Sequence, residues 1–164
     1  MENITRHGGR LVLLLIFLCM MAFGVNAQGQ QAPVRWRTLV KMTSPTEGVI
    51  TIKCFLAEGT HVYGMKLPEG GPKATTIDFA GCEGLKLTGA LEAKPAATEM
   101  EDPMFGMKLE QWTGNFELTQ RFKLTGSAEK AKMSVKIHYM SCDNKNCRPP
   151  KAEVFTAKIP EFKK

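Results

Sequence analysis

The sequence predicts an all-β fold, and more specifically a β-sandwich. Short segments alternate between apolar and polar residues with a period of two along most of the chain. Gly and Pro, present 15 and 9 times, fall between these segments and mark turns. No segment after the first 30 residues has the steady apolar stripe of a long amphipathic helix. Seven to nine short strands with turns between them are typical of two packed antiparallel sheets.

The chain of 164 residues begins with a segment that has the composition of a secretory signal. Arg6 and Arg10 precede an apolar run over residues 11–25, and small or modest residues follow at 25–27. This run of about fifteen residues is shorter than the roughly 20 that a membrane span needs. We therefore expect a cleaved signal peptide over residues 1–27, with an uncleaved anchor as the alternative.

The remaining residues, 28–164, are enough for one domain with its own core. Loss of the signal removes two arginines and one glutamate, so the net charge of +6 becomes +5. The basic residues are scattered along the sequence and are not interleaved with aromatic residues, which disfavours nucleic-acid binding. Export implies an oxidising compartment in which disulfides persist.

The first half of the domain contains the clearest strand patterns. Residues 34–42 and 49–57 alternate, and we expect 61–63 and 74–79 to be shorter extended pieces. Turns are expected at 44–48, 58–60 and 67–72. The side chains expected to face the core are Val34, Trp36, Val40, Met42, Ile50, Ile52, Cys54 and Leu56.

The second half is less regular at first. Residues 85–87 form a short extended piece, and 90–100 is expected to be irregular because it has no helical stripe and Pro95 interrupts it. A loop is expected over 101–107, followed by strands at 116–124, 133–139 and 155–159. The expected inward residues are Phe116, Leu118, Phe122, Leu124, Met133, Val135, Ile137, Tyr139, Phe155, Ala157 and Ile159.

The most informative stretch is the cysteine pair at 142 and 147. Cys142 and Cys147 flank four polar residues at the end of a predicted strand, and two prolines follow. A tight turn there brings two Cα atoms within the roughly 4.4–6.8 Å that a disulfide needs. A loop of about six residues contributes only about 2 kcal/mol of chain-entropy stabilisation, against about 3.5 kcal/mol for a loop near thirty. This favours a redox-active pair, while a stapling disulfide remains the alternative.

Thiol exchange needs an attacking thiolate and a resolving thiol. Arg148 adjoins Cys147, and Lys145 and Lys151 are close in sequence. Cationic neighbours stabilise a thiolate, although Asp143 opposes them. We therefore expect Cys147 to attack and Cys142 to resolve.

The other cysteines show no comparable pattern. Cys54 is expected in the core and Cys82 in a loop, and a disulfide between them is an open hypothesis. They are 28 residues apart and form no zinc knuckle, so we expect no metal site. The sequence also shows no catalytic triad, phosphate loop or paired carboxylates, and we expect no cofactor.

Two further pairs are candidates for the surroundings of the thiols. His61 and Tyr63 share one side of an extended segment and could form hydrogen bonds near the thiols, although a structural tyrosine and an exposed histidine are the simpler expectation. Met104 and Phe105 could fold over the cysteine turn as an apolar lid, or could close one end of the core.

Three motifs together resemble a known family, the N-terminal periplasmic domain of the thiol:disulfide interchange protein DsbD. The segment 57–63, Ala-Glu-Gly-Thr-His-Val-Tyr, is similar to the family's glycine and tyrosine segment. The segment 101–106, Glu-Asp-Pro-Met-Phe-Gly, resembles its acidic, aromatic and glycine cap loop. The segment 139–150 resembles its tyrosine, cysteine, short polar loop, cysteine and Pro-Pro signature.

This resemblance implies an immunoglobulin-like sandwich in the periplasm with a redox-active pair, Cys142 and Cys147. It also implies a shielding cap at Asp102, Met104 and Phe105, with His61, Tyr63 and Arg148 as neighbours of the site. The implied electron donor is the thioredoxin-like domain of a membrane thiol reductase. The implied acceptors are periplasmic thioredoxin-fold proteins, including disulfide isomerases and proteins of cytochrome c biogenesis. A non-enzymatic binding or structural module of the same fold is the alternative.

Overall fold

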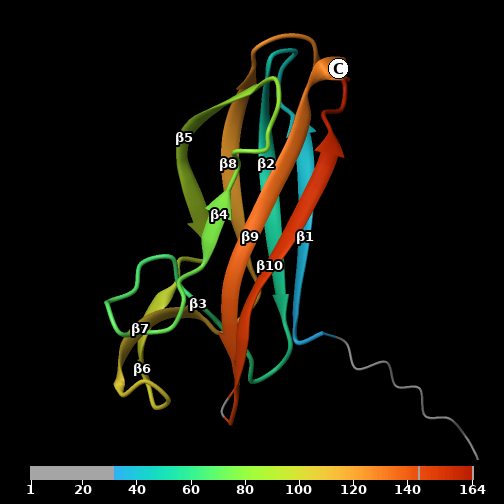
Figure 1. Cartoon of the computed structure of the whole chain (residues 1–164). Coiled ribbons are helices and arrows are strands. Elements are labelled where there is room, and N and C mark those ends of the chain that lie inside the picture. Colours follow the sequence, from blue (N-terminus) through green and yellow to red (C-terminus); the bar gives the residue numbers. More distant parts are fainter. Residues whose placement is uncertain (1–31, 144, 164) are drawn as a thin grey trace, which may run out of the picture. The chain divides into compact units, whose positions relative to one another are not determined.

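The structure is a computed structural model that describes residues 32–143 and 145–163. The predicted signal peptide over residues 1–27 lies outside the described residues. Within the described part, no helix is long and apolar enough to cross a membrane. The described residues form two packed antiparallel sheets, the arrangement of an immunoglobulin-like β-sandwich (Figure 1).

The described residues contain ten strands and one short 3₁₀ helix. In chain order they are β1 (Val34–Met42), β2 (Glu47–Leu56), β3 (His61–Tyr63), β4 (Thr76–Asp78), β5 (Leu85–Lys94), β6 (Thr98–Asp102), β7 (Met107–Trp112), β8 (Phe116–Leu124), η1 (Ala128–Lys130), β9 (Lys132–Cys142) and β10 (Cys147–Lys158).

One sheet has four strands in the order β1-β2-β8-β5. The other has the order β10-β9-β3-β7-β6, and β4 also pairs with β9. The short strands β3 and β4 therefore share one long neighbour, β9, and β3 joins it to the hairpin of β6 and β7. As a result β6, β7 and the turn from β9 to β10 lie at the same end of the sandwich (Figure 1).

The core lies between the sheets because alternate residues of each strand point inward. Ile50, Ile52, Leu118, Val135 and Ile137 are completely buried. The sequence-based inward positions of β1, β2, β8 and β9 are thus confirmed, since all belong to the main core cluster or pack against it.

Aromatic rings pack around Phe116 in this core. The Trp36 ring meets Phe116 edge-on at 5.6 Å between centroids, and the Trp112 ring stacks on Phe116 at 4.0 Å. A second, smaller cluster consists of Tyr63, Leu109 and Cys142. Because Cys142 belongs to this second cluster, the side chains that pack in it also surround the disulfide.

The expectation of an irregular segment over residues 90–100 is wrong, because most of it belongs to β5 and β6, and β7 was not expected. The reason lies in how these strands pair with their neighbours in the folded sheets. The edge strand β5 changes its register against β8 between Thr88 and Glu92, which breaks its alternation. In β6, only Asp102 is buried, so the strand shows no apolar pattern and is defined by its ladder with β7.

The hypothesis of a disulfide between Cys54 and Cys82 is also wrong, because both cysteines are free. Cys54 is buried on the inner face of β2, as expected. Cys82 lies in the turn before β5, where its thiol donates to the Ser134 carbonyl oxygen and accepts from the Ser134 amide, both at 3.3 Å.

Candidate functional site

The site is built around a disulfide between Cys142 and Cys147. Cys142 ends β9, Cys147 begins β10, and the two lie directly opposite in the ladder with Cα atoms 4.0 Å apart. After Arg148 the register shifts, at Pro149 and Pro150, whose nitrogens carry no ladder donor. Next to the disulfide, regular pairing of β10 with β9 is therefore limited to Cys147 and Arg148.

Asp143 shapes the turn between the two cysteines. Its Oδ1 accepts the amides of Lys145 and Asn146 at 2.9 and 2.8 Å, and its own amide donates to the Asn146 carbonyl oxygen at 2.9 Å. These amide donors, and then the Arg148 guanidinium, hold the pKa of the Asp143 carboxyl below its usual value. From sequence, Asp143 was considered only as an unfavourable charge. The run Asp-Asn-Lys-Asn is itself a turn signal that indicates its structural role.

The two sulfur-bearing residues differ in exposure. Cys142 is completely buried, whereas Cys147 is only partly buried. Of the two cysteines, Cys147 is therefore the one that is partly exposed to solvent.

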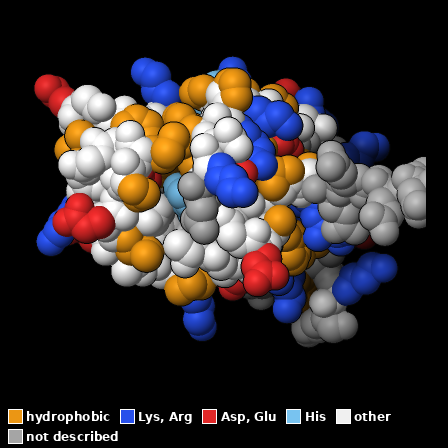
Figure 2. All heavy atoms as spheres, turned by 90° about the horizontal axis from the view of Figure 1, so that it is seen from below, with side chains coloured by type: hydrophobic (Ala, Val, Ile, Leu, Met, Phe, Trp, Pro, Cys, Tyr) orange, Lys and Arg blue, Asp and Glu red, His pale blue; other side chains and the backbone are white. Residues whose placement is uncertain are grey.

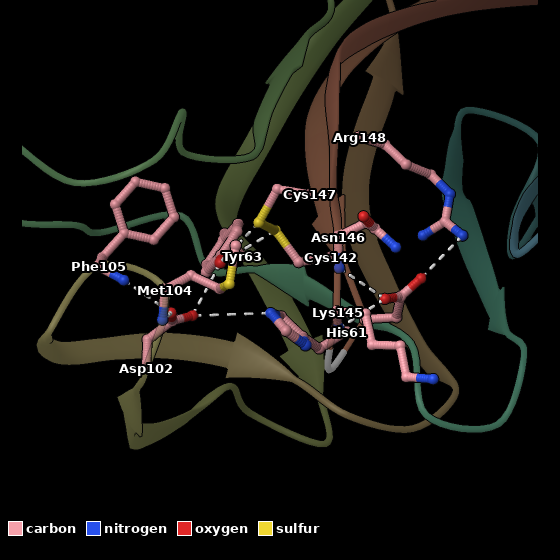
Figure 3. The surroundings of a disulfide bond; sticks show 11 residues. His61, Tyr63, Asp102, Met104, Phe105, Cys142, Lys145, Asn146, Cys147 and Arg148 are labelled. Atoms are coloured by element: carbon pink, nitrogen blue, oxygen red, sulfur yellow. Dashed lines mark hydrogen bonds and ion pairs between the residues drawn. A yellow bond between two sulfur atoms is a disulfide. The ribbon is translucent and has the colours of Figure 1, made fainter.

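Tyr63 lies against the buried sulfur. Strand β3 runs between β9 and β7, and this position places the fully buried Tyr63 ring under the disulfide (Figure 3). Its hydroxyl oxygen is 3.2 Å from Cys142 Sγ and 3.9 Å from Cys147 Sγ, and it donates to Asp102 Oδ2 at 2.8 Å. Burial, followed by the hydrogen bond to Asp102, raises the Tyr63 pKa well above its ordinary value, so the hydroxyl stays protonated.

Asp102 connects this tyrosine to the turn between β6 and β7. The Asp102 side chain is buried, and its Oδ1 accepts the amides of Met104 and Phe105 at 2.8 and 3.2 Å. The Gly106 amide closes the turn on the Asp102 carbonyl oxygen at 2.7 Å, with a positive φ of 63° that suits glycine. One carboxylate therefore holds both the turn backbone and the Tyr63 hydroxyl.

Met104 and Phe105 lie at the tip of this turn. The Phe105 ring meets Tyr63 edge-on at 5.9 Å and packs on the cluster that contains Cys142. Met104 is 51% exposed, and its side chain extends toward the disulfide (Figure 3). Hydrophobic side chains are exposed at several separate places on this end of the molecule (Figure 2). Phe105 therefore packs on the cluster that contains Cys142 and not in the main core cluster, whereas Met104 belongs to neither cluster.

His61 lies directly opposite Cys142 in the ladder of β3 and β9. Its side chain is only 15% exposed, so the expectation of an exposed histidine is wrong. The ring meets Tyr63 edge-on at 5.1 Å, and Nε2 is 3.7 Å from Asp102 Oδ2 without a hydrogen-bond partner. Burial lowers the His61 pKa, although Asp102 and Asp143 partly oppose this shift.

Arg148 is oriented differently from the other candidates. Its Nη2 donates to Asp143 Oδ2 at 3.2 Å, and the side chain is 40% exposed (Figure 3). It pairs across the ladder with Ser141 and not with a cysteine. The structure thus brings His61, Tyr63, Asp102, Met104 and Phe105 together at the disulfide, and places Arg148 against the turn.

Sequence reasoning missed Leu109, the third member of the buried cluster with Tyr63 and Cys142. Leu109 belongs to β7, where Leu109, Gln111 and Trp112 are buried, and only this weak pattern in the sequence could have indicated it. Among the described residues, no group of three or more His, Cys, Asp or Glu side chains is placed to bind a metal ion.

The fold and this site define a class of domain: a β-sandwich with a disulfide between adjacent strands and a short apolar turn beside it. The family model for the N-terminal part of the thiol:disulfide interchange protein DsbD matches residues 28–159, and the chain belongs to this family of periplasmic domains. No curated protein matches the sequence.

A solved structure supports the fold. The N-terminal periplasmic domain of ScsB from Proteus mirabilis superimposes with a TM-score of 0.59 at 14% identity, over 84% of this chain and 50% of that one. The chain thus spans about half the length of that structure. The GAE domains of yeast GGA1 and of GGA2p from Saccharomyces cerevisiae give TM-scores of 0.44 and 0.42 at 13% and 12% identity. They cover 80% and 81% of this chain, and 95% and 94% of their own.

Proposed function

We propose that this protein is an exported, periplasmic electron carrier that works through Cys142 and Cys147. It takes electrons from the thioredoxin-like domain of a membrane thiol reductase and passes them to periplasmic thioredoxin-fold proteins. The observation that carries the proposal is the asymmetry of the pair, because a buried Cys142 and a partly exposed Cys147 give the two sulfurs different tasks.

The exchange proceeds in two substitutions at sulfur. A partner thiolate attacks Cys147 Sγ, the bond between the two cysteines breaks, and Cys142 leaves as a thiolate that takes up a proton. The second partner thiolate then attacks the partner's own sulfur in the mixed disulfide and releases Cys147, which is also protonated. The partner is oxidised to a disulfide, and this domain gains two electrons and two protons. Transfer to an acceptor is the reverse sequence.

Tyr63 is placed to assist the first step. A thiolate on the buried Cys142 has no solvent to stabilise it, and the Tyr63 hydroxyl at 3.2 Å is a donor within reach. The hydroxyl carries one hydrogen, so its donation to sulfur replaces its donation to Asp102. When the Cys142 thiolate forms, Asp102 therefore loses the hydrogen bond from Tyr63, and Asp102 is also the residue whose carboxylate holds the turn.

The turn from 103 to 106 acts as a cap. Phe105 packs on the cluster beneath the disulfide, and Met104 extends toward it. A partner that attacks Cys147 in line with the disulfide needs this turn displaced. The hydrogen bonds from Met104 and Phe105 to Asp102 set the cost of that displacement.

Capture of a mixed disulfide tests the assignment of the two cysteines. A thioredoxin that keeps only its attacking cysteine, activated with a thionitrobenzoate leaving group, is mixed with reduced variants. The variant Cys142→Ser keeps the accessible thiol and should form a stable adduct, while Cys147→Ser should form almost none. The variant Cys82→Ser is the control and should behave as the unmodified protein. Equal capture by Cys147→Ser would overturn the assignment.

The reduction potential separates an exchange pair from a structural staple. Exchange-active pairs lie between about −120 and −270 mV, whereas structural disulfides generally lie below about −300 mV. We expect a value in the upper range after equilibration with thiol buffers. A much lower value would favour the alternative of a binding module with a stapled turn.

A further inference from the structure

The outer face of the four-stranded sheet collects the positive charge of the domain. Residues directly opposite in an antiparallel ladder point to the same face, and the ladders of β1, β2, β8 and β5 define the outward set. We call this surface the basic face. Its cations are Arg35, Arg37, Lys41, Lys53, Lys86, Lys94, Arg121 and Lys123, and its anions are Glu47, Glu92 and Glu117.

Eight cations and three anions give the basic face a formal charge of +5. Residues 32–143 and 145–163 contain 19 Lys and Arg and 15 Asp and Glu, a net charge of +4. The rest of the described residues, the buried Asp102 included, therefore carry a net charge of −1. Charges that are scattered in the sequence are brought onto one side because alternate residues of four neighbouring strands share that side.

The anions leave most of this charge unpaired. Glu117 pairs with Lys53 at 3.5 Å, and Glu47 with Lys123 at 2.8 Å. The other six cations of the basic face share a single anion, Glu92. All six of these cations are exposed. Every strand of the sheet contributes cations, so the charge is spread over the sheet and does not converge on one recess.

Apolar groups lie among these cations. The guanidinium groups of Arg35 and Arg37 lie 5.8 and 6.0 Å from the centre of the Phe55 ring. Leu39 follows Arg37 on the same face of β1 and is 56% exposed. A broad cationic surface with an exposed leucine and an aromatic ring has the composition that binds the headgroup region of an anionic bilayer.

We propose that the basic face is a docking surface for an anionic phospholipid membrane. Charge complementarity carries the inference, and the exposed Leu39 favours a lipid surface over a purely polar polyanion. The disulfide joins the end of β9 to the start of β10, which belong to the other sheet, so it does not lie on this face. The end of the sandwich where β9 meets β10 can be seen in Figure 1. A domain that lies with its basic face on a membrane therefore keeps Cys147 open to proteins at the membrane surface.

The test is co-sedimentation of the protein, as purified after export, with vesicles of phosphatidylglycerol and phosphatidylcholine in equal parts. We expect binding that falls as salt is raised, and little binding to vesicles of phosphatidylcholine alone. Each basic residue near an anionic surface contributes about 1 kcal/mol, which corresponds to a factor of about five in the partition coefficient. The variant Arg35→Glu, Arg37→Glu, Arg121→Glu should therefore bind at least about 100-fold more weakly.

The matched control reverses three charges on the outer face of the other sheet, as Lys132→Glu, Lys136→Glu, Lys158→Glu. These lysines are exposed, and the control has the same net charge as the first variant. We expect it to keep at least a tenth of the affinity of the unmodified protein. Equal losses in both variants would overturn the proposal, because net charge alone would then account for binding. Equal binding to neutral vesicles, or no binding to anionic ones, would also overturn it. None of these outcomes bears on thiol exchange, which the capture experiment tests separately.

Discussion

The Tyr63 hydroxyl lies 3.2 Å from Cys142 Sγ and 2.8 Å from Asp102 Oδ2, so one donor faces both the buried sulfur and the carboxylate that holds the cap. These three groups come from β3, β9 and β6, which belong to one sheet, with β7 between β3 and β6. Hydrogen bonds through Tyr63 and Asp102 therefore connect the disulfide to the turn at 103–106.

Replacement of Tyr63 by Phe should slow the reduction of the disulfide by dithiothreitol, because the Cys142 thiolate loses its donor. It should also lower the free energy of unfolding by about 1–3 kcal/mol, because the buried Asp102 carboxylate loses a hydrogen bond. Tyr139→Phe is the matched control, since its hydroxyl donates to Glu153 at 2.7 Å within the main core. The control should change stability and leave the reduction rate unaltered. Equal reduction rates in the two variants would contradict a role for Tyr63 at the sulfur.

Replacement of Phe105 by Ala should speed reduction by small thiols, because the cap loses its packing on Tyr63. An edge-to-face aromatic pair contributes about 0.5–1.5 kcal/mol, so the rate should rise about two- to tenfold. Stopped-flow measurement of dithiothreitol reduction provides the rate. Met100→Ala removes an apolar side chain that is 43% exposed on β6, and it should have no effect. A rate that is unchanged in Phe105→Ala would show that the cap does not limit access.

His61 should make the domain less stable in mild acid. Burial lowers its folded-state pKa below the unfolded value near 6.5, so the unfolded chain takes up the proton first as the pH falls. Stability is therefore full above about pH 7 and declines as the pH falls through the unfolded pKa toward the folded one. Urea unfolding at a series of pH values should show this decline, and His61→Asn should reduce it. His138→Asn, at an exposed site on β9, should retain the full decline.

Alkylation with iodoacetamide should distinguish the two free cysteines. Burial of Cys54 raises its pKa well above the ordinary value, so it should remain unmodified in the folded protein. Cys82 is half-buried and should be modified slowly. Both should react after unfolding without reductant, as mass spectrometry can show. Failure of either to react in the unfolded protein would indicate that it is bonded.

The sequence patterns located the long strands well, because β1, β2, β8 and β9 each bury one face against the opposite sheet. They failed for β5, β6 and β7, at the edges and at the end of the sandwich. In β5 and β6 the backbone ladder, and not burial, decides the structure. A strand such as β6, with only Asp102 buried, leaves no apolar period to detect.

The site shows the same division. The spacing of Cys142 and Cys147, together with the strand before them, was sufficient to predict a turn that joins them. Arg148 was expected beside the reactive sulfur, but its ladder position pairs it with Ser141 and turns it to Asp143. Sequence distance does not fix the face of the strand to which a neighbour points.

The sequence by itself determined the β-sandwich, its main core and the pair of cysteines, because these depend on local periodicity and on short spacing. Only the tertiary structure decided which groups surround the disulfide and where the charge collects. Tyr63, Asp102 and Cys142 are far apart in the chain and meet because β3 joins β9 to the hairpin of β6 and β7. The basic face likewise exists only when four strands align, since the order and register of strands bring together residues that no local pattern connects.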